Sequence, residues 1–209
     1  MSILQRLADK TSQLGAAGLL RCAAAKAWLR LVRAAFGFES WHASAPAACR
    51  PYKGIVRAAA DALGPGTAVE VGCGLGEIVA GVRAGARYGI DIDPAVLRAA
   101  LFLHGRRVSF TQGSLEAAAD LPAASIDVLI MCNWLHSVET DELRGRLRCL
   151  LAARRVGHIV IDVIHPGVPG FRCHHDPQAL FRGMARVTRT LDDGGEGVRS
   201  IVVARVNGE

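Results

Sequence analysis

The chain has 209 residues, of which 51% are hydrophobic and 21% are charged. This length and composition predict one compact folded unit and exclude a disordered protein. The net charge of +6 is uneven, because residues 1–60 hold nine Lys or Arg side chains against two acidic ones and so carry +7. Such a basic segment suits an anionic substrate, lipid or nucleic acid, or simply a solvated helix face.

Apolar runs and cysteines narrow the class of protein. No run of about 18 uncharged apolar residues occurs, so we expect no membrane-spanning helix. Arg6, Asp9 and Lys10 interrupt the first apolar stretch, which therefore does not resemble a signal peptide and favours a cytoplasmic location. The six cysteines form no CxxC pair. We expect no metal site, and we expect the cysteines in apolar runs to be buried, reduced thiols.

Apolar residues recur at helical spacing through residues 3–36, where Gly15 and Gly18 should break the helix in two. A linker of small residues and prolines follows, and Pro51 suits the first turn of the next helix. Residues 1–50 are expected to form a helical N-terminal segment, ahead of a larger domain over residues 51–209.

Strand-like and helix-like segments alternate in the larger domain, and its last two strands form a hairpin. The expected strands cover residues 67–71, 87–92, 107–112, 125–133, 157–164, 185–191 and 199–206. The expected helices cover residues 51–63, 77–83, 94–103, 139–153 and 176–183, with a short Ala-rich helix after the third strand. Repeated βαβ units predict an α/β fold with a doubly wound, mostly parallel sheet of seven strands, closed by an antiparallel hairpin. Ligands should bind beyond the carboxyl ends of the parallel strands.

Three glycines at alternate positions follow the first of these strands, in the sequence VEVGCGLGE. Gly72 and Gly74 allow the backbone to pass close to a ligand. A dinucleotide fingerprint needs a further glycine at position 77, where this chain has Glu77, an anion that would repel a pyrophosphate at a helix N-terminus. No P-loop lysine follows either. The turn therefore predicts a nucleoside that has a positive centre and no phosphate chain.

The chain resembles the class I S-adenosylmethionine-dependent methyltransferases over about residues 52–206. VEVGCGLGE is similar to the first motif of this family, YGIDIDP to its second-strand motif, and SIDVLIMCNWLHSV to its fourth strand and the following turn. The stretch FGFxSWHxS…RPY resembles bacterial biosynthetic methyltransferases that act on small molecules. The resemblance implies S-adenosylmethionine as the cofactor and methyl transfer as the reaction.

The resemblance also assigns roles to residues around the glycine turn. Asp91 is expected to accept both ribose hydroxyls, and Asp93 to cap the next helix. Many family members carry an Asp after the third strand, whereas Ser114 here would bind the adenine amino group more weakly. The full set of expected cofactor-binding residues is Glu70, Gly72, Cys73, Gly74, Gly76, Asp91, Ile92, Ser114, Leu115 and Asn133.

The resemblance implies that residues 1–50 form a helical lid that covers the substrate. Candidate residues for the acceptor side therefore come from loops and from this N-terminal lid. Transfer to a hydroxyl requires removal of a proton, and histidine is the commonest base. The expected catalytic residues are His136, His165 and His175, each of which also has a structural alternative such as a helix cap. The expected substrate contacts are Trp41, His42, Arg50, Tyr52 and Trp134. Alternatively, Trp28 and Trp41 only pack the N-terminal helices onto the domain.

Missing motifs indicate the class of acceptor. The tetrapeptide Asn-Trp-Leu-His is not the [DNS]PP[YFW] motif of adenine and glutamine N-methyltransferases, and no Pro-Cys nucleophile or RNA-binding module is found. We therefore expect the hydroxyl or amine of a small molecule, such as a natural product or a sugar, and no nucleic acid. The alternatives are an RNA or protein methyltransferase guided by the basic segment, and a non-catalytic binding subunit. A peripheral membrane contact and a homodimer remain open.

Overall fold

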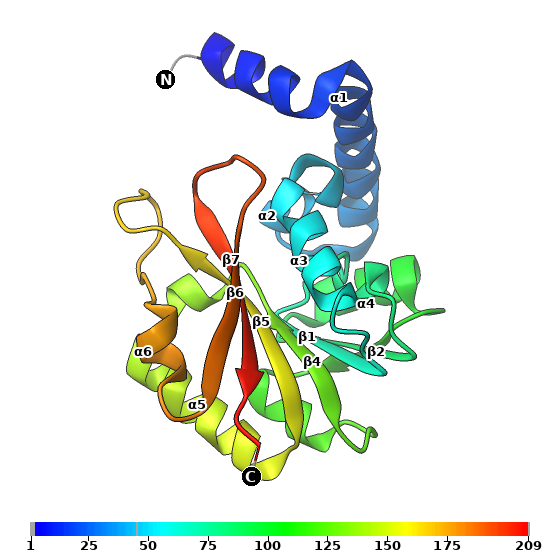
Figure 1. The fold of residues 1–209 in the computed structure, drawn as a ribbon. Coiled ribbons are helices and arrows are strands. Elements are labelled where there is room, and N and C mark those ends of the chain that lie inside the picture. The colour runs from blue at the N-terminus through cyan, green and yellow to red at the C-terminus, as the bar shows by residue number, and fades with distance from the viewer. Residues whose placement is uncertain (1–2, 45, 209) are drawn as a thin grey trace.

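The computed structural model describes residues 3–44 and 46–208, with side chains from residue 15 onward. Its centre is a seven-stranded sheet in the order β3-β2-β1-β4-β5-β7-β6 (Figure 1). Six of these strands run in one direction, and β7 runs antiparallel to them. The strands are β1 (Thr67–Val71), β2 (Ala86–Asp91), β3 (Ser109–Gln112), β4 (Ile126–Met131), β5 (Val156–Ile164), β6 (Ala185–Asp192) and β7 (Arg199–Val206). The predicted sheet and its closing hairpin are confirmed.

Six helices and several short 3-10 turns precede or connect these strands within the described part of the chain. The helices are α1 (Ile3–Phe36), α2 (Ser40–Ser44), α3 (Pro51–Asp61), α4 (Pro94–His104), α5 (Thr140–Ala153) and α6 (Pro177–Phe181). The 3-10 turns are η1 (Ala47–Cys49), η2 (Val79–Gly81), η3 (Leu115–Asp120) and η4 (Leu135–Ser137). No helix in the described ranges is both long enough and apolar enough to cross a bilayer.

Two of the predicted helices are wrong. The segment expected as a helix over residues 77–83 contains only η2, and the Ala-rich helix after β3 is only η3. Glu70 accepts the backbone N–H of Val79 at 2.9 Å, at the start of η2. The segment after the glycine turn is therefore held by a side chain of β1.

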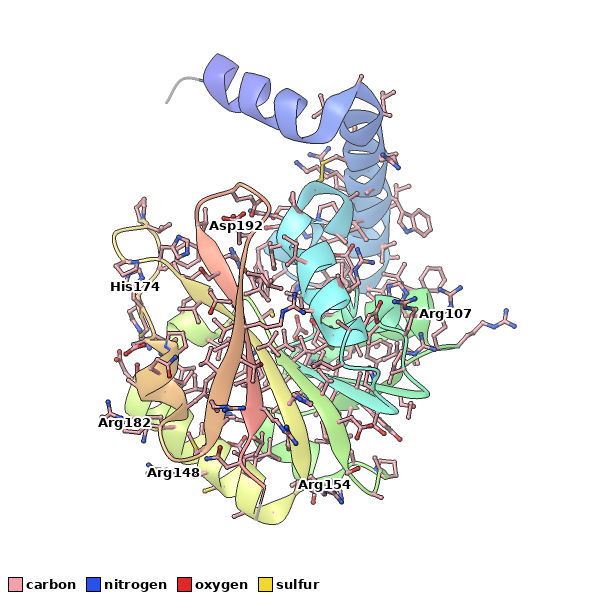
Figure 2. The ribbon with its side chains drawn as sticks, viewed as in Figure 1. Arg107, Arg148, Arg154, His174, Arg182 and Asp192 are labelled. Atoms are coloured by element: carbon pink, nitrogen blue, oxygen red, sulfur yellow. A yellow bond between two sulfur atoms is a disulfide. The ribbon has the colours of Figure 1, made fainter. Side chains whose placement is uncertain are left out.

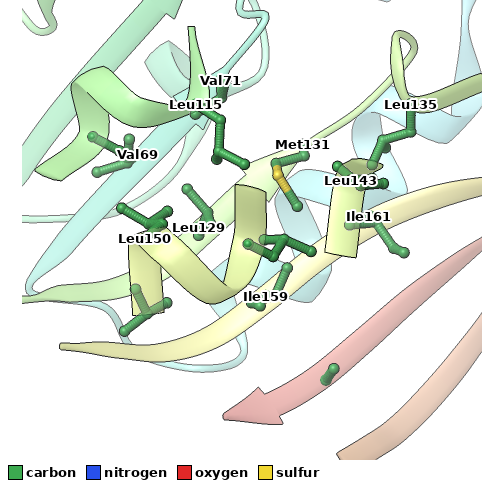
Figure 3. Packing of buried hydrophobic residues seen from close by; sticks show 14 of the residues in the cluster. Val69, Val71, Leu115, Leu129, Met131, Leu135, Leu143, Leu150, Ile159 and Ile161 are labelled. Atoms are coloured by element: carbon green, nitrogen blue, oxygen red, sulfur yellow. The ribbon is translucent and has the colours of Figure 1, made fainter. Parts of the chain in front are cut away.

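The sheet is covered on both faces, which accounts for its nearly continuous apolar strands. Figure 3 shows α5 lying across one face, where Leu143 and Leu150 pack over Val69, Leu129 and Ile159 of three neighbouring strands. The alternate residues of these strands face the other way and pack against α3. The core therefore holds the carboxyl ends of the parallel strands at fixed positions.

The N-terminal segment is fastened to this domain at several points. Helix α1 bends at Gly15, whose φ is 63°, so one of the two predicted breaks is confirmed. Beyond the bend, Leu29 and Val32 pack against α2, α4 and the linker between α1 and α2. A disulfide joins Cys22 of α1 to Cys49 of η1 (Figure 2). The expectation of reduced thiols is wrong for this pair, because the fold brings together two cysteines 27 positions apart.

Candidate active site

Three adjacent strands, β2, β1 and β4, end at a cavity of about 390 Å³. The chain order along the sheet reverses between β1 and β4, and ligands of doubly wound sheets bind at such a switch point. The turn after β1 lines the cavity, and residues of the N-terminal segment line it too. All five expected substrate contacts lie on its wall: Trp41, His42, Arg50, Tyr52 and Trp134.

Two glycines allow aromatic side chains to approach the turn closely. Gly72 and Gly74 have φ values of 69° and 52°, in the left-handed region that strains other residues. A Cβ at position 72 would overlap the indole of Trp134, and one at position 74 would lie 3.0 Å from Nδ1 of His42. The indole is fixed in place, because its Nε1 donates to the carbonyl of Val71 at 2.7 Å. The turn therefore lies between two aromatic walls.

Two buried carboxyl groups lie beside the turn. Asp91 ends β2 and accepts the N–H of Gly74 at 2.7 Å and that of Asp93 at 3.0 Å. Asp93 caps α4 as predicted, since its side chain accepts the N–H of Ala95. Glu70 is completely buried, and burial raises its pKa to about 8, although the Val79 N–H acts in the opposite direction. Near pH 7 the Glu70 carboxyl therefore keeps its proton and lies on the cavity wall together with Asp91.

Glu77 has a different role from the one that its sequence position predicts. No helix begins there, and its carboxylate instead accepts the N–H of Ala47 at 2.9 Å and pairs with the ammonium of Lys53 at 2.7 Å. The prediction that Glu77 lies at a helix N-terminus is therefore wrong. Glu77 ties the N-terminal segment to the glycine turn, and so helps to place the wall that carries Trp41 and His42.

A buried charged network supports the loop after β4, and sequence reasoning missed half of it. Asn133, with φ of 67°, donates its N–H to Asp162 at 2.8 Å and accepts from Arg199 at 3.2 Å. Arg199 and Asp162 form a buried ion pair, and the guanidinium lies 4.2 Å from the centre of the Tyr52 ring. Burial raises the pKa of Tyr52 above its ordinary value, so the phenol keeps its proton. Charged residues inside apolar strands were the signal for this network.

The expected cofactor residues gather at the cavity, with one exception. Gly76 is not on its wall, and a Cβ there would lie 2.8 Å from the ring of Phe110, so this glycine serves packing. Ile92 lines the cavity and is 71% exposed. The hydroxyl of Ser114 donates to Glu116, which in turn binds Arg146 at 2.7 Å. The other expected residues on the wall are Glu70, Gly72, Cys73, Gly74, Asp91, Leu115 and Asn133.

The three expected catalytic histidines do not line this cavity. Both ring nitrogens of the buried His175 are hydrogen-bonded, to Thr140 and to the carbonyl of Leu135, each at 2.9 Å. His165 binds the hydroxyl of Ser200 through Nε2 at 2.8 Å. These contacts fix the loops after β4 and β5 and leave the rings away from the glycine turn.

Of the two remaining candidate histidines, His136 lies off the cavity wall and His42 lies on it. His136 stacks edge-on against Phe171, with ring centres 4.7 Å apart. Among the described residues, His42 is the histidine on the cavity wall, and its ring stacks on Trp41 with centres 3.5 Å apart. Burial lowers the pKa of His42, although Asp91 and Asp93 raise it in part. A neutral imidazole therefore lies against Gly74 of the glycine turn, while the indole of Trp134 lies against Gly72.

Comparisons with known proteins agree with this geometry. Residues 69–160 match the family described as "Methyltransferase domain". Comparison with curated proteins found no sequence match. Among solved structures, the N-methyltransferase NodS from Bradyrhizobium japonicum, in complex with S-adenosyl-L-homocysteine, superposes with a TM-score of 0.64 at 12% identity over 86% of this chain and 98% of its own.

Two further structures share the fold. Magnesium protoporphyrin IX methyltransferase from Synechocystis, with bound S-adenosylhomocysteine, has a TM-score of 0.57 at 18% identity over 76% of this chain and 84% of its own. A TehB-like methyltransferase from Corynebacterium glutamicum has a TM-score of 0.56 at 14% identity over 87% of this chain and 96% of its own. The matched domain carries both the glycine turn and Asp91, within a fold that these enzymes share. Residues 69–160 therefore form a methyltransferase domain, and the chain has the fold of the class I S-adenosylmethionine-dependent methyltransferases.

Proposed function

We propose that this methyltransferase acts on a hydroxyl or an amine of a small molecule. The observation that carries the proposal is the single cavity in which the glycine turn and Asp91 meet Trp41 and His42 of the N-terminal segment. One cavity lined by both sets of residues suits a donor and a compact acceptor side by side. An acceptor class such as a natural product or a sugar fits its mixture of aromatic and polar walls.

The residues on the wall are chemically suited to S-adenosylmethionine, which supplies a methyl group on a sulfonium centre when bound. The Gly72–Gly74 backbone lines the cavity, and the rings of Trp134 and His42 fill the space that Cβ atoms would take. The Asp91 oxygens each accept one N–H and retain lone pairs for ribose hydroxyls. Ile92 offers an apolar surface to a purine ring, and the carboxyl of Glu70 offers a hydrogen-bonding group to the methionine end.

We assign the role of general base to His42. Its lowered pKa leaves the imidazole neutral near pH 7, the form that can take a proton. When the S–CH3 bond of the donor broke and the methyl group joined the acceptor oxygen or nitrogen, the neutral imidazole of His42 would take the proton that the acceptor loses, and the demethylated donor would leave as a thioether. Trp41 and Trp134 flank this position and hold a flat acceptor away from water. His136, His165 and His175 support the surrounding loops in this proposal.

A labelling experiment tests the class of acceptor. The purified chain is incubated with methyl-labelled S-adenosylmethionine and a cell extract that has been separated into small-molecule, RNA and protein fractions. The proposal predicts label in the small-molecule fraction, and loss of that label when His42 is replaced by Ala. Incorporation into RNA or protein alone would establish the alternative that the basic N-terminal segment suggests.

A further inference from the structure

Helix α1 has two apolar faces, and the domain covers only one of them. The inner face carries Cys22, Leu29 and Val32, which are all less than 9% exposed. Leu20 and Leu31 lie on the outer face, since helix positions three, four, seven and eleven apart fall on one side. They are 73% and 66% exposed. The need for a hydrophobic core accounts for the inner face and leaves the outer one unexplained.

The outer face is apolar along its length. Trp28 borders Leu20 and Leu31 and is 49% exposed, and the small residues Ala23, Ala24 and Ala27 complete this face. About half of Trp28 is exposed to solvent, so packing onto the domain uses only part of this side chain. Figure 1 shows that α1 lies at the edge of the molecule, away from the sheet. We call the surface formed by Leu20, Ala23, Ala24, Ala27, Trp28 and Leu31 the outer face.

Cations lie at the edges of the outer face: by helical spacing Arg21 adjoins Trp28 on one side, and Arg30 adjoins Ala23 on the other. Residues 11–38 contain four Lys or Arg side chains and no Asp or Glu. Three of the cations, Lys26, Arg30 and Arg33, line a groove of about 440 Å³ between α1 and α2. Trp41 lines both this groove and the active-site cavity. An apolar strip with a row of cations beside it is the chemistry of helices that lie in the interface of an anionic bilayer.

We propose that the outer face of α1 docks the enzyme on the surface of a bilayer that contains anionic phospholipid. Leu20, Trp28 and Leu31 enter the headgroup region, and Arg21 and Arg30, which lie at the two edges of the outer face, bind lipid phosphates. A second copy of the chain fits this surface less well, because two outer faces would bring two rows of cations together without an acidic partner. The proposal concerns where the enzyme sits and does not depend on which molecule it methylates.

Vesicle flotation with the full chain tests the proposal. The chain should float with vesicles of phosphatidylglycerol and phosphatidylcholine in equal amounts, and should stay behind with pure phosphatidylcholine. Binding should weaken as salt is added, because exposed charges are screened. Equal binding to both kinds of vesicle, or to neither, would overturn the proposal even if every variant failed to fold.

Matched variants locate the contact. Trp28→Gln, Leu31→Gln and Arg30→Glu should each weaken binding to the anionic vesicles roughly tenfold or more. Trp28→Phe should keep most of it, because the aromatic surface remains. Arg148→Glu makes the same change in charge at the opposite end of the molecule (Figure 2), and should leave binding close to that of the parent chain.

Two further outcomes would overturn the proposal that the outer face docks on a bilayer. Calorimetry with S-adenosylmethionine shows whether each variant keeps a folded cofactor site. If Arg148→Glu weakens flotation as much as Arg30→Glu, the attraction is diffuse and the outer face has no special part. If the chain forms dimers in solution and Trp28→Gln abolishes them without changing flotation, the face is a self-association surface and the proposal is wrong.

Discussion

At the scale of single residues, His42 is the side chain whose replacement should lower the rate of methyl transfer most. Because burial lowers its pKa below 6.5, we expect the rate of methyl transfer to stay level through neutral pH and to fall only in acid, where the imidazole gains a proton. His42→Gln should lower kcat roughly a hundredfold and leave cofactor affinity intact. Steady-state rates across pH, measured on the labelled acceptor, check this. A comparable loss in His136→Gln, with His42→Gln unaffected, would move the role of base to the loop after β4.

The raised pKa of Glu70 predicts that the stability of the fold depends on pH in an unusual direction. Its carboxyl keeps its proton to about pH 8 in the folded state, whereas in the unfolded chain it ionises near 4.5. The folded state therefore binds more protons in this window, and the free energy of unfolding should fall as pH rises, by up to roughly 1.4 kcal/mol per pH unit. Urea denaturation at several pH values measures the slope. Glu70→Gln should flatten it, while Glu142→Gln on the exposed face of α5 should not; an unchanged slope in Glu70→Gln would refute the assignment.

Replacement of Gly72 tests whether the turn requires a residue without a side chain. Gly72→Ala places a methyl group on the indole of Trp134 and strains a φ of 69°. We expect a loss of stability of roughly 1–2 kcal/mol or more, together with weaker cofactor binding. Gly145→Ala is a matched control in α5, where nothing lies within 4 Å of the new Cβ. That variant should be at least as stable as the parent, since Ala favours a helix. Equal melting temperatures for both variants would contradict this account.

At the scale of elements, the disulfide holds α1 against η1 and closes the segment that contains α2. Replacing both Cys22 and Cys49 by Ala should lower the free energy of unfolding by roughly 3–4 kcal/mol, because a long loop in the unfolded chain is released. A reducing agent should act in the same way on the parent chain. Urea denaturation checks both, with Cys149→Ala, which removes an exposed free thiol, as the control. Identical midpoints for all forms would mean that the bond adds no stability. In a reducing compartment such as the expected cytoplasm the bond would open.

The elements also show what periodicity can and cannot predict. The central strands β1, β4 and β5 were predictable because they are apolar on both faces, and Asp93-Pro94 marked the start of α4. The segment after the glycine turn was predicted wrongly as a helix, because its spacing could not show that Glu70 of β1 binds its backbone. The same limit applies to α1, whose apolar spacing could not show which of its two faces would meet the domain.

At the scale of the whole molecule, most of the cofactor side of the cavity could be predicted and much of the acceptor side could not. The glycine turn and Asp91 follow adjacent parallel strands, so their meeting follows from the βαβ order alone. His42 reaches the turn through contacts such as those of Glu77 with Ala47 and Lys53, which join segments far apart in the chain. The buried pair of Asp162 and Arg199 likewise joins β5 to β7, and only the three-dimensional fold shows it.

The central claim is that the cavity at the end of β1 and β2 binds S-adenosylmethionine through the glycine turn and Asp91. Isothermal titration calorimetry of the parent chain and of Asp91→Ala tests it most directly, with Asp120→Ala as a control for loss of an exposed carboxylate. We expect Asp91→Ala to bind the cofactor at least roughly tenfold more weakly, about 1.4 kcal/mol, and Asp120→Ala to match the parent. No heat of binding to the parent chain at about millimolar cofactor, or equal affinity in Asp91→Ala, would contradict it.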